Sequence, residues 1–465
     1  MHYPYLSFLL ALVLIVSPFC LLAQVEEEEK ESESMDGIAA FSFDDFRKVK
    51  EDFEIQPFMM LQLWGVYTQN QKIQATDNQG ALLFEADGTP VFREVDDRLN
   101  VTWRRARLGF RANPYERLRF TLVFSYDQIG RDGLGGTIGG YNNDPFVGVW
   151  DAFFQYQFLE NSQGLNLVAG FFRPQLGRES ITSGWSVTSF EKSMSQTYIR
   201  DHLVGRDRGR SMGLNIGGTF PGDGLGFNYN VGLFNPQETS DTTFAGRTTV
   251  GTIFAPLWAG RGVLYIGDPE QDEYKIGYET NHFGERNGLS LGVGGSYQGE
   301  TEIFESSTSF AADMLFNYGP ITIDGEYIIM NRSDARNFVV DKVGEIDYTS
   351  TTGHGRAGYS FVVSDQFLEA VGMIMFFEGA EVGAVDNQGN AEQVQARRVE
   401  AFSGDEFTYD AGINWYLNKR KLKLMAHYTW RDSDNRGRNA YWRQSRFDGN
   451  IQRGNWWGVG LHAIF

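Results

Sequence analysis

The sequence has almost no cysteine and little histidine. Its one cysteine, Cys20, lies in the apolar segment at the start of the chain, so the remaining part has none. This excludes a disulfide framework and leaves no thiolate for a metal site or a nucleophile. The six histidines show no His-x-x-x-His spacing, and His202 and His462 fit wall positions better than catalytic bases. We therefore expect no enzyme activity, no catalytic residues, no cofactor and no metal.

Long hydrophobic runs are also missing, with one exception. Residues 6–23 are apolar and are followed by Gln24 and an acidic stretch, which is typical of a secretory signal peptide over residues 1–23. An N-terminal membrane anchor is the alternative. Residues 24–56 hold 12 acids and 4 bases, and we expect them to form an acidic periplasmic segment.

Positive charge is in the minority. The formal net charge of -19 makes nucleic acid an unexpected partner.

Proline is sparse at 12 residues, whereas glycine reaches 54 and aromatic residues 15%. Mean hydropathy is -0.35, which does not fit a helical membrane protein. A strand barrel needs an apolar residue only at every second position, so it can sit in lipid with such an average.

From Pro57 onward the hydrophobic pattern repeats every two residues, as in a strand. In residues 118–126, leucine and aromatic side chains alternate with Arg119, Thr121, Val123 and Ser125. Many such segments are about ten residues long, the length that crosses a bilayer at a tilt. The fold class predicted for residues 57–465 is therefore all-β, a transmembrane antiparallel barrel in the bacterial outer membrane. Its sixteen strands are predicted at 57–68, 100–112, 117–127, 147–158, 165–173, 209–219, 225–235, 258–267, 288–298, 307–318, 320–331, 351–363, 367–378, 405–417, 421–431 and 451–465.

The predicted connections alternate between long and short. Short periplasmic turns and long external loops are typical of outer-membrane barrels, and an even strand count returns both ends to the periplasm. Residues 268–287 break this rhythm, because they are too long for a tight turn at a periplasmic position. A further short strand within them, over 274–281, is one interpretation.

The last predicted strand places Trp457, Val459, Leu461, Ala463 and Phe465 in one phase. A final strand closing on an aromatic resembles the signal read by the barrel assembly machinery, which we expect as a partner through Phe465. The last strand of a soluble sheet is the alternative.

Strand parity also suggests where arginines face. With Leu108 turned toward lipid, Arg105, Arg107 and Arg111 point into the lumen, and Arg119 follows on the next strand. Each would cost roughly 2 to 4 kcal/mol against hydrocarbon at mid-bilayer depth. Arg104 has lipid parity and is expected to reach the rim.

Residues 174–207 form an unusually long connection that must either fold inward or extend outside. It carries further bases: Arg178, Lys192, Arg200 and Arg206. Together with the strand arginines, these are the candidate pore-lining residues. A chain of guanidinium groups, charged at any physiological pH, could pass an anion onward without holding it tightly.

Several blocks of the sequence resemble the phosphate-selective porin O/P family. They begin with RRARLGFRANPYERLRFTLVFSYD and lie at 104–127, 149–194 and 206–218, with weaker likeness at 324–328 and 410–430. The resemblance implies a sixteen-strand barrel, usually a homotrimer, whose third external loop, here 174–207, folds into the lumen. It also implies arginines and lysines along an anion path.

A second role for these bases stays open. An arginine that pairs with an inward carboxylate would brace the wall instead of binding solutes. Parity turns several acids inward: Asp151, Asp313, Asp324, Glu326, Glu369 and Asp410. The leading hypothesis is passive, anion-preferring diffusion of small, phosphate-like solutes. The rivals are a weakly selective porin, or one for sugars or carboxylates, and a non-conducting adhesin or structural barrel. The expected partners are outer-membrane lipid and small anionic or polar solutes.

Overall fold

The computed structural model describes residues 53–81, 83–86, 91–136, 147–205, 208–236, 239–240, 248–249, 252–335, 346–379, 405–433, 451–452 and 454–465. The predicted signal peptide, most of the acidic segment and Arg206 lie outside the described residues.

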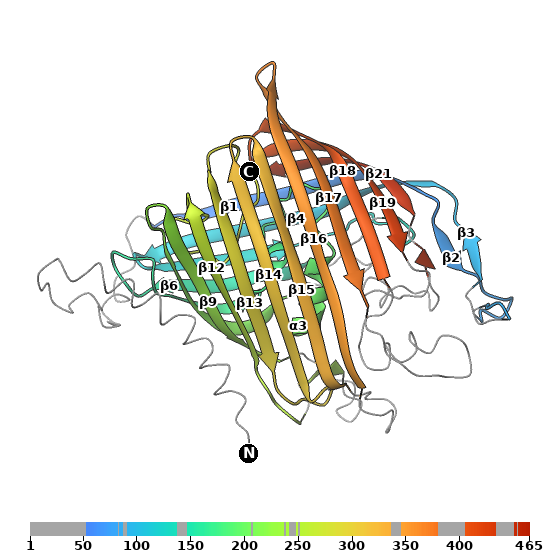
Figure 1. Ribbon diagram of the computed structural model, residues 1–465, viewed down its shortest axis with the longest axis horizontal. Helices are drawn as coiled ribbons and strands as arrows, with labels where there is room; N and C mark the ends of the chain where they lie inside the picture. Colours follow the sequence, from blue (N-terminus) through green and yellow to red (C-terminus); the bar gives the residue numbers. More distant parts are fainter. Residues whose placement is uncertain are drawn as a thin grey trace, which may run out of the picture.

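Sixteen antiparallel strands close into one barrel (Figure 1). Around the barrel the order is β1-β21-β19-β18-β17-β16-β15-β14-β13-β12-β9-β8-β7-β6-β5-β4. Neighbouring barrel strands follow one another along the chain, except where the first strand, β1, pairs with the last, β21, and closes the barrel. The strands are β1 (Ile55–Gln69), β4 (Arg98–Tyr115), β5 (Leu118–Ser125), β6 (Gly148–Gln157), β7 (Asn166–Phe172), β8 (Ser211–Phe220), β9 (Leu225–Phe234), β12 (Leu257–Gly267), β13 (Gly288–Gln298), β14 (Ser306–Tyr318), β15 (Ile321–Ala335), β16 (Ile346–Val363), β17 (Gln366–Glu378), β18 (Asp405–Asn418), β19 (Leu422–Ser433) and β21 (Asn455–Ile464).

The barrel predicted from the two-residue repeat is confirmed, with one boundary corrected. Residues 451–452 are not part of the last barrel strand. They form β20 (Ile451–Gln452), which pairs with β2 (Lys72–Gln74); β2 also pairs with β3 (Phe92–Glu94), giving a small separate sheet. A second small sheet joins β10 (Thr239–Ser240) to β11 (Thr248–Thr249).

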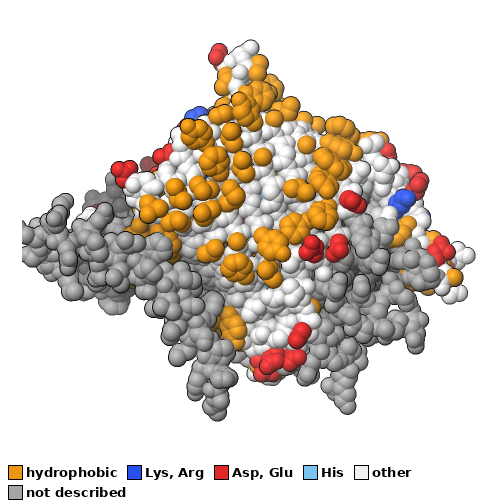
Figure 2. Space-filling model, viewed as in Figure 1, with side chains coloured by type: hydrophobic (Ala, Val, Ile, Leu, Met, Phe, Trp, Pro, Cys, Tyr) orange, Lys and Arg blue, Asp and Glu red, His pale blue; other side chains and the backbone are white. Residues whose placement is uncertain are grey.

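The outer surface of the barrel is apolar. On the face formed by β12 to β17, hydrophobic side chains spread over the wall, and acidic side chains lie toward its edges (Figure 2). Phe310 of β14 and Val459 of β21 are two exposed examples. Such a surface is stable against acyl chains and would be a liability in water. Among the described residues, no helix is both long enough and apolar enough to cross a membrane.

The barrel has one end with short turns and one with long connections. Only two residues, 319–320, join β14 to β15, and two more, 364–365, join β16 to β17. Phe465 lies at this end, where its backbone exchanges hydrogen bonds with Met59 (Figure 1). Short turns mark the periplasmic end of outer-membrane barrels.

Among the register shifts of the described strands, two β-bulges each add a side chain to the lumen. On β4, Arg105 pairs with Gln62 but Trp103 pairs with Leu63, which leaves Arg104 as the extra residue. On β6, the register skips Trp150 in the same way opposite β5. A bulge sets two residues against one, so neighbouring side chains can share a face.

In the part of the chain that the structure describes, two connections lie inside the barrel. Loop 173–210, between β7 and β8 at the long-loop end, carries α2 (Arg178–Ile181) and α3 (Ser195–Val204). Helix α3 ends at Gly205, whose left-handed backbone (φ 67°) suits a helix cap. Its side chains pack on β15 to β17, and the Tyr198 ring stacks on Phe377 at 3.7 Å between centroids.

Segment 268–287 enters from the periplasmic end, between β12 and β13. The interpretation of residues 274–281 as a short strand is wrong. The β-pairing in this segment is a single isolated bridge, between Tyr278 and Thr182. Tyr274 and Tyr278 are fully buried, and their hydroxyls bond to Asn230 and Asn228 of β9 at 2.6 and 2.9 Å. The segment therefore packs against the inner wall and meets loop 173–210 there.

Candidate functional site

A cavity of about 600 Å³ remains between the two inner connections and the wall of β1, β4, β5 and β6. We call it the basic cavity, because eleven bases and only four acids line it among the residues that the structure describes. The bases are Arg104, Arg105, Arg107, Arg111, Arg119, Arg173, Lys192, Arg200, Arg208, Arg210 and Lys275, and the acids are Asp127, Asp151, Glu191 and Glu279. The excess of cations makes the cavity attractive to anions.

The bulge on β4 places two arginines on one carboxylate. Glu191 of loop 173–210 accepts hydrogen bonds from Arg104 and Arg105, each at 2.5 Å. Burial alone would raise the pKa of Glu191, but the two guanidinium groups outweigh it and lower the pKa to about 2. These two ion pairs fix loop 173–210 to β4. The expectation that Arg104 reaches the lipid-side rim is wrong, because the bulge breaks the parity on which it rested.

The bulge on β6 places Trp150 between two arginines. The guanidinium carbons of Arg107 and Arg210 lie 3.7 and 4.0 Å from the centre of its ring. Both arginines also hold carboxylates, Arg107 at 2.6 Å from Asp127 and Arg210 at 3.1 Å from Asp151. Cation–π stacking and ion pairing together fix the direction of these side chains.

Arg111 and Arg119 are the more accessible arginines of the cavity. Arg111 is exposed to the lumen and lies 4.5 Å over the ring of Phe58. Arg119 retains 43% of its side-chain exposure, and its nearest carboxylate is that of Glu273 at 3.8 Å. By contrast, Arg107 retains 10% and Arg105 5%.

Lys192 and Arg200 line the cavity from loop 173–210, but both bond within that loop. Lys192 donates to the carbonyl oxygens of Glu179 and, at 2.9 Å, of Thr182. Burial, together with the charge of Arg200, lowers the pKa of Lys192. Arg200 donates to the Ser180 hydroxyl at 3.2 Å. Their main contacts therefore hold the loop in shape.

Arg178 lies apart from the basic cavity, where the two inner connections meet. Its guanidinium group forms a bidentate pair with Glu270 at 2.8 and 2.9 Å and a third bond to Asp313 at 2.9 Å. Arg261 also binds Asp313. All four side chains are at most 1% exposed, so this network links loop 173–210, segment 268–287 and the wall away from the cavity.

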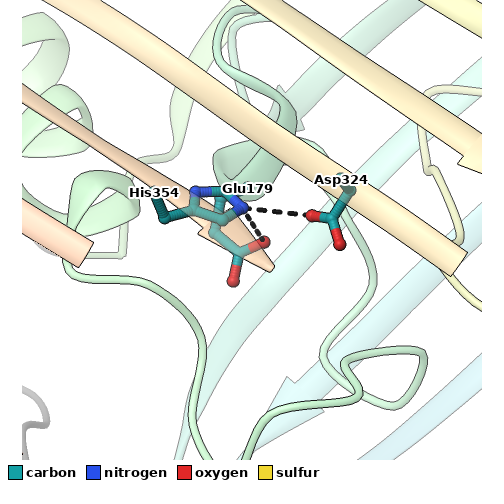
Figure 3. Close-up of side chains that lie close together, drawn as sticks. All are labelled: Glu179, Asp324 and His354. Carbon is teal, nitrogen blue, oxygen red and sulfur yellow. Dashed lines mark hydrogen bonds and ion pairs between the residues drawn. The ribbon is translucent and has the colours of Figure 1, made fainter. Parts of the chain in front are cut away.

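The inward acids predicted on the later strands lie beneath loop 173–210. In Figure 3, Glu179 of α2 lies close to Asp324 of β15 and His354 of β16. The His354 ring nitrogen is 3.1 Å from Asp324 and 4.0 Å from Glu179. Among the described residues, this is the group near enough to hold a metal ion. Arg356, however, donates to both carboxylates at 3.1 and 2.7 Å, so a fixed cation already balances their charge.

Other acids of this half anchor the loop in similar ways. Glu326 accepts from the Glu179 amide at 3.1 Å and from the Ser195 hydroxyl at 2.5 Å. Asp410 accepts from the Phe190 amide at 3.3 Å, and Glu369 accepts from Asn281 of segment 268–287 at 2.9 Å. The covered half of the barrel is therefore braced, while the bases face the open half.

Sequence reasoning missed several bases and the aromatic residues of the cavity. Trp150 and Arg104 lie at bulges, which periodicity cannot reveal. Arg173 directly follows β7, and Lys275 belongs to segment 268–287, whose fold was not predicted. The unusual length of segment 268–287 at a periplasmic position was the signal in the sequence that it folds into the lumen.

Comparison with known families agrees with this geometry. A family model described as phosphate-selective porin O and P matches residues 83–453. The chain belongs to the phosphate-selective porin O and P family. It is therefore a porin of the bacterial outer membrane, and the family and the fold are those of a channel rather than an enzyme. No curated protein matches this sequence.

Three solved structures are similar to this family member at low sequence identity. An anion-selective porin from Comamonas acidovorans is 13% identical, with a TM-score of 0.52 over 89% of this chain and 100% of that one. OmpF of Salmonella typhi in complex with daunomycin is 12% identical, with a TM-score of 0.48 over 88% and 97%. The trimer form of OmpT from Vibrio cholerae is 11% identical, with a TM-score of 0.40 over 89% and 100%.

Proposed function

We propose that this porin lets small anions, including phosphate-like ones, diffuse passively through the basic cavity. The observation that supports it is the ratio of eleven bases to four acids in the described part of the cavity wall. The inward acids of β14 to β18 do not cancel this charge, because loop 173–210 and segment 268–287 cover them. Among the predicted residues, we assign Arg111 and Arg119 to direct contact with solutes. Arg105, Arg107, Lys192 and Arg200 shape the cavity, and Arg178 braces it.

Reversal potentials in planar bilayers under a KCl gradient test this proposal. We expect a preference for chloride, and we expect the double variant Arg111→Ala, Arg119→Ala to reduce it severalfold, since two accessible arginines of the basic cavity are lost. Arg98→Ala is the matched control: Arg98 is paired with Asp132 at 3.0 Å and does not line the basic cavity.

Other outcomes would favour the rival functions. A preference for potassium that the double variant leaves unchanged would defeat the anion proposal and favour a general or other-nutrient porin. Absence of conductance in any salt would favour a structural barrel or adhesin.

A further inference from the structure

One end of the basic cavity combines accessible arginines with an aromatic wall. Arg111 of β4 pairs across the sheet with Thr121 of β5, so Arg119 is its diagonal neighbour on the same inner face. Among the described residues, no carboxylate forms an ion pair with Arg111, and Arg119 has only its 3.8 Å contact with Glu273. Two guanidinium groups with so little counter-charge attract an anionic group.

The aromatic wall consists of Phe58 and Trp185. Arg111 stacks on Phe58 with 4.5 Å from guanidinium carbon to ring centre, and Phe58 meets Trp185 edge-on at 6.4 Å between centroids. Both rings line the basic cavity and are only half-buried. A guanidinium group whose face lies on a ring keeps its in-plane N–H donors free to bind both oxygens of a carboxylate.

The two kinds of surface discriminate between anions. Inorganic phosphate is hydrated on every side and gains nothing from contact with rings. An organic anion can place its carboxylate on Arg111 and Arg119 and its apolar body against Phe58 and Trp185. Covering one ring face in this way is enough for roughly a tenfold gain in affinity.

We propose that Phe58, Arg111, Arg119 and Trp185 form a subsite for organic anions that join a carboxylate to an apolar body, in preference to inorganic phosphate. This subsite rests on the proposed function, since a solute reaches it only through an open, anion-accepting cavity. It gives the porin a preferred class of substrate that its fold alone does not specify.

Block of the chloride current in planar bilayers tests the subsite, with benzoate, acetate and inorganic phosphate as probes. We expect half-block by benzoate at about a tenfold lower concentration than by acetate, which has the same carboxylate but no ring, and than by phosphate. Trp185→Ala should abolish most of this difference. Phe58→Leu, which keeps an apolar side chain without a ring, should reduce it independently. Trp457→Ala is the matched control, because Trp457 faces outward and is 56% exposed.

A separate comparison, of current block in Arg111 variants, tests the arginine part of the subsite. Arg111→Ala should weaken block by benzoate and acetate alike, and Arg111→Lys should restore part of it. Equal half-block concentrations for the three probes would overturn the subsite, as would a benzoate preference that survives both ring substitutions. Failure of the proposed function is a different result, namely a reversal potential in KCl that shows no chloride preference.

Discussion

Arginine has two distinct roles inside this barrel, and the environment of each side chain separates them. Arg178 is 1% exposed and surrounded by Glu270 and Asp313, whereas Arg119 is 43% exposed with one distant carboxylate. A buried guanidinium group among carboxylates adds no charge to the path, because its field is cancelled locally. Accessible guanidinium groups can exchange water for a solute anion, and we therefore propose that they decide selectivity.

Removing Arg178 should therefore destabilise the protein more than it changes selectivity. Arg178→Ala leaves Glu270 without its bidentate partner and Asp313 with Arg261 alone, and we expect a loss of about 3–5 kcal/mol in the free energy of unfolding. Guanidinium-induced unfolding in detergent measures it, with Arg119→Ala as control. Equal unfolding midpoints for the two variants would contradict the bracing role.

At the scale of elements, the position of loop 173–210 depends on close packing against the wall. Phe190 of this loop packs among Trp64, Trp456 and His427, at 4.5 to 5.8 Å between ring centroids. Gly458 of β21 lies directly below the Phe190 ring, where a Cβ atom would come within 2.5 Å of it. The absence of a side chain at this position lets the loop lie against the strand.

Gly458→Ala should lift this part of the loop from the wall. Because the ring must move, we expect a loss of roughly 1–3 kcal/mol in the free energy of unfolding and a noisier single-channel current. Thermal unfolding and bilayer recordings measure the two effects. Gly372→Ala is the control, since a Cβ atom there meets nothing within 4 Å. A quiet current and an unchanged melting temperature would show that the loop is not held at Gly458.

At the scale of the whole molecule, the two inner connections divide the lumen by charge. The inner surface of β14 to β18 supplies carboxylates that bind loop 173–210 and segment 268–287. The opposite wall of β4 to β6 leaves its bases facing the basic cavity. The acids are thus covered by the two connections, and the lumen that remains open beside β4 to β6 is lined mainly by bases.

We also propose that the porin assembles as a homotrimer, as its family implies. Light scattering of the detergent-solubilised protein should give a protein mass close to three chains. A protein mass of one chain under conditions that preserve conductance would reject the trimer. The apolar outer wall described above is equally suited to lipid, so the barrel itself does not fix the number of subunits.

The sequence by itself determined the wall of this protein. A two-residue repeat must turn one side of each strand to lipid and the other to the lumen. The number and positions of the strands therefore followed from local alternation, as did the inward direction of four arginines: Arg105, Arg107, Arg111 and Arg119. Only the tertiary structure decided which bases solutes can reach. Bulges at Arg104 and Trp150 depend on pairing with a neighbouring strand, and the burial of Arg178 and Asp324 depends on connections distant in the chain. Alternation is a local property, whereas register and the docking of loops are not.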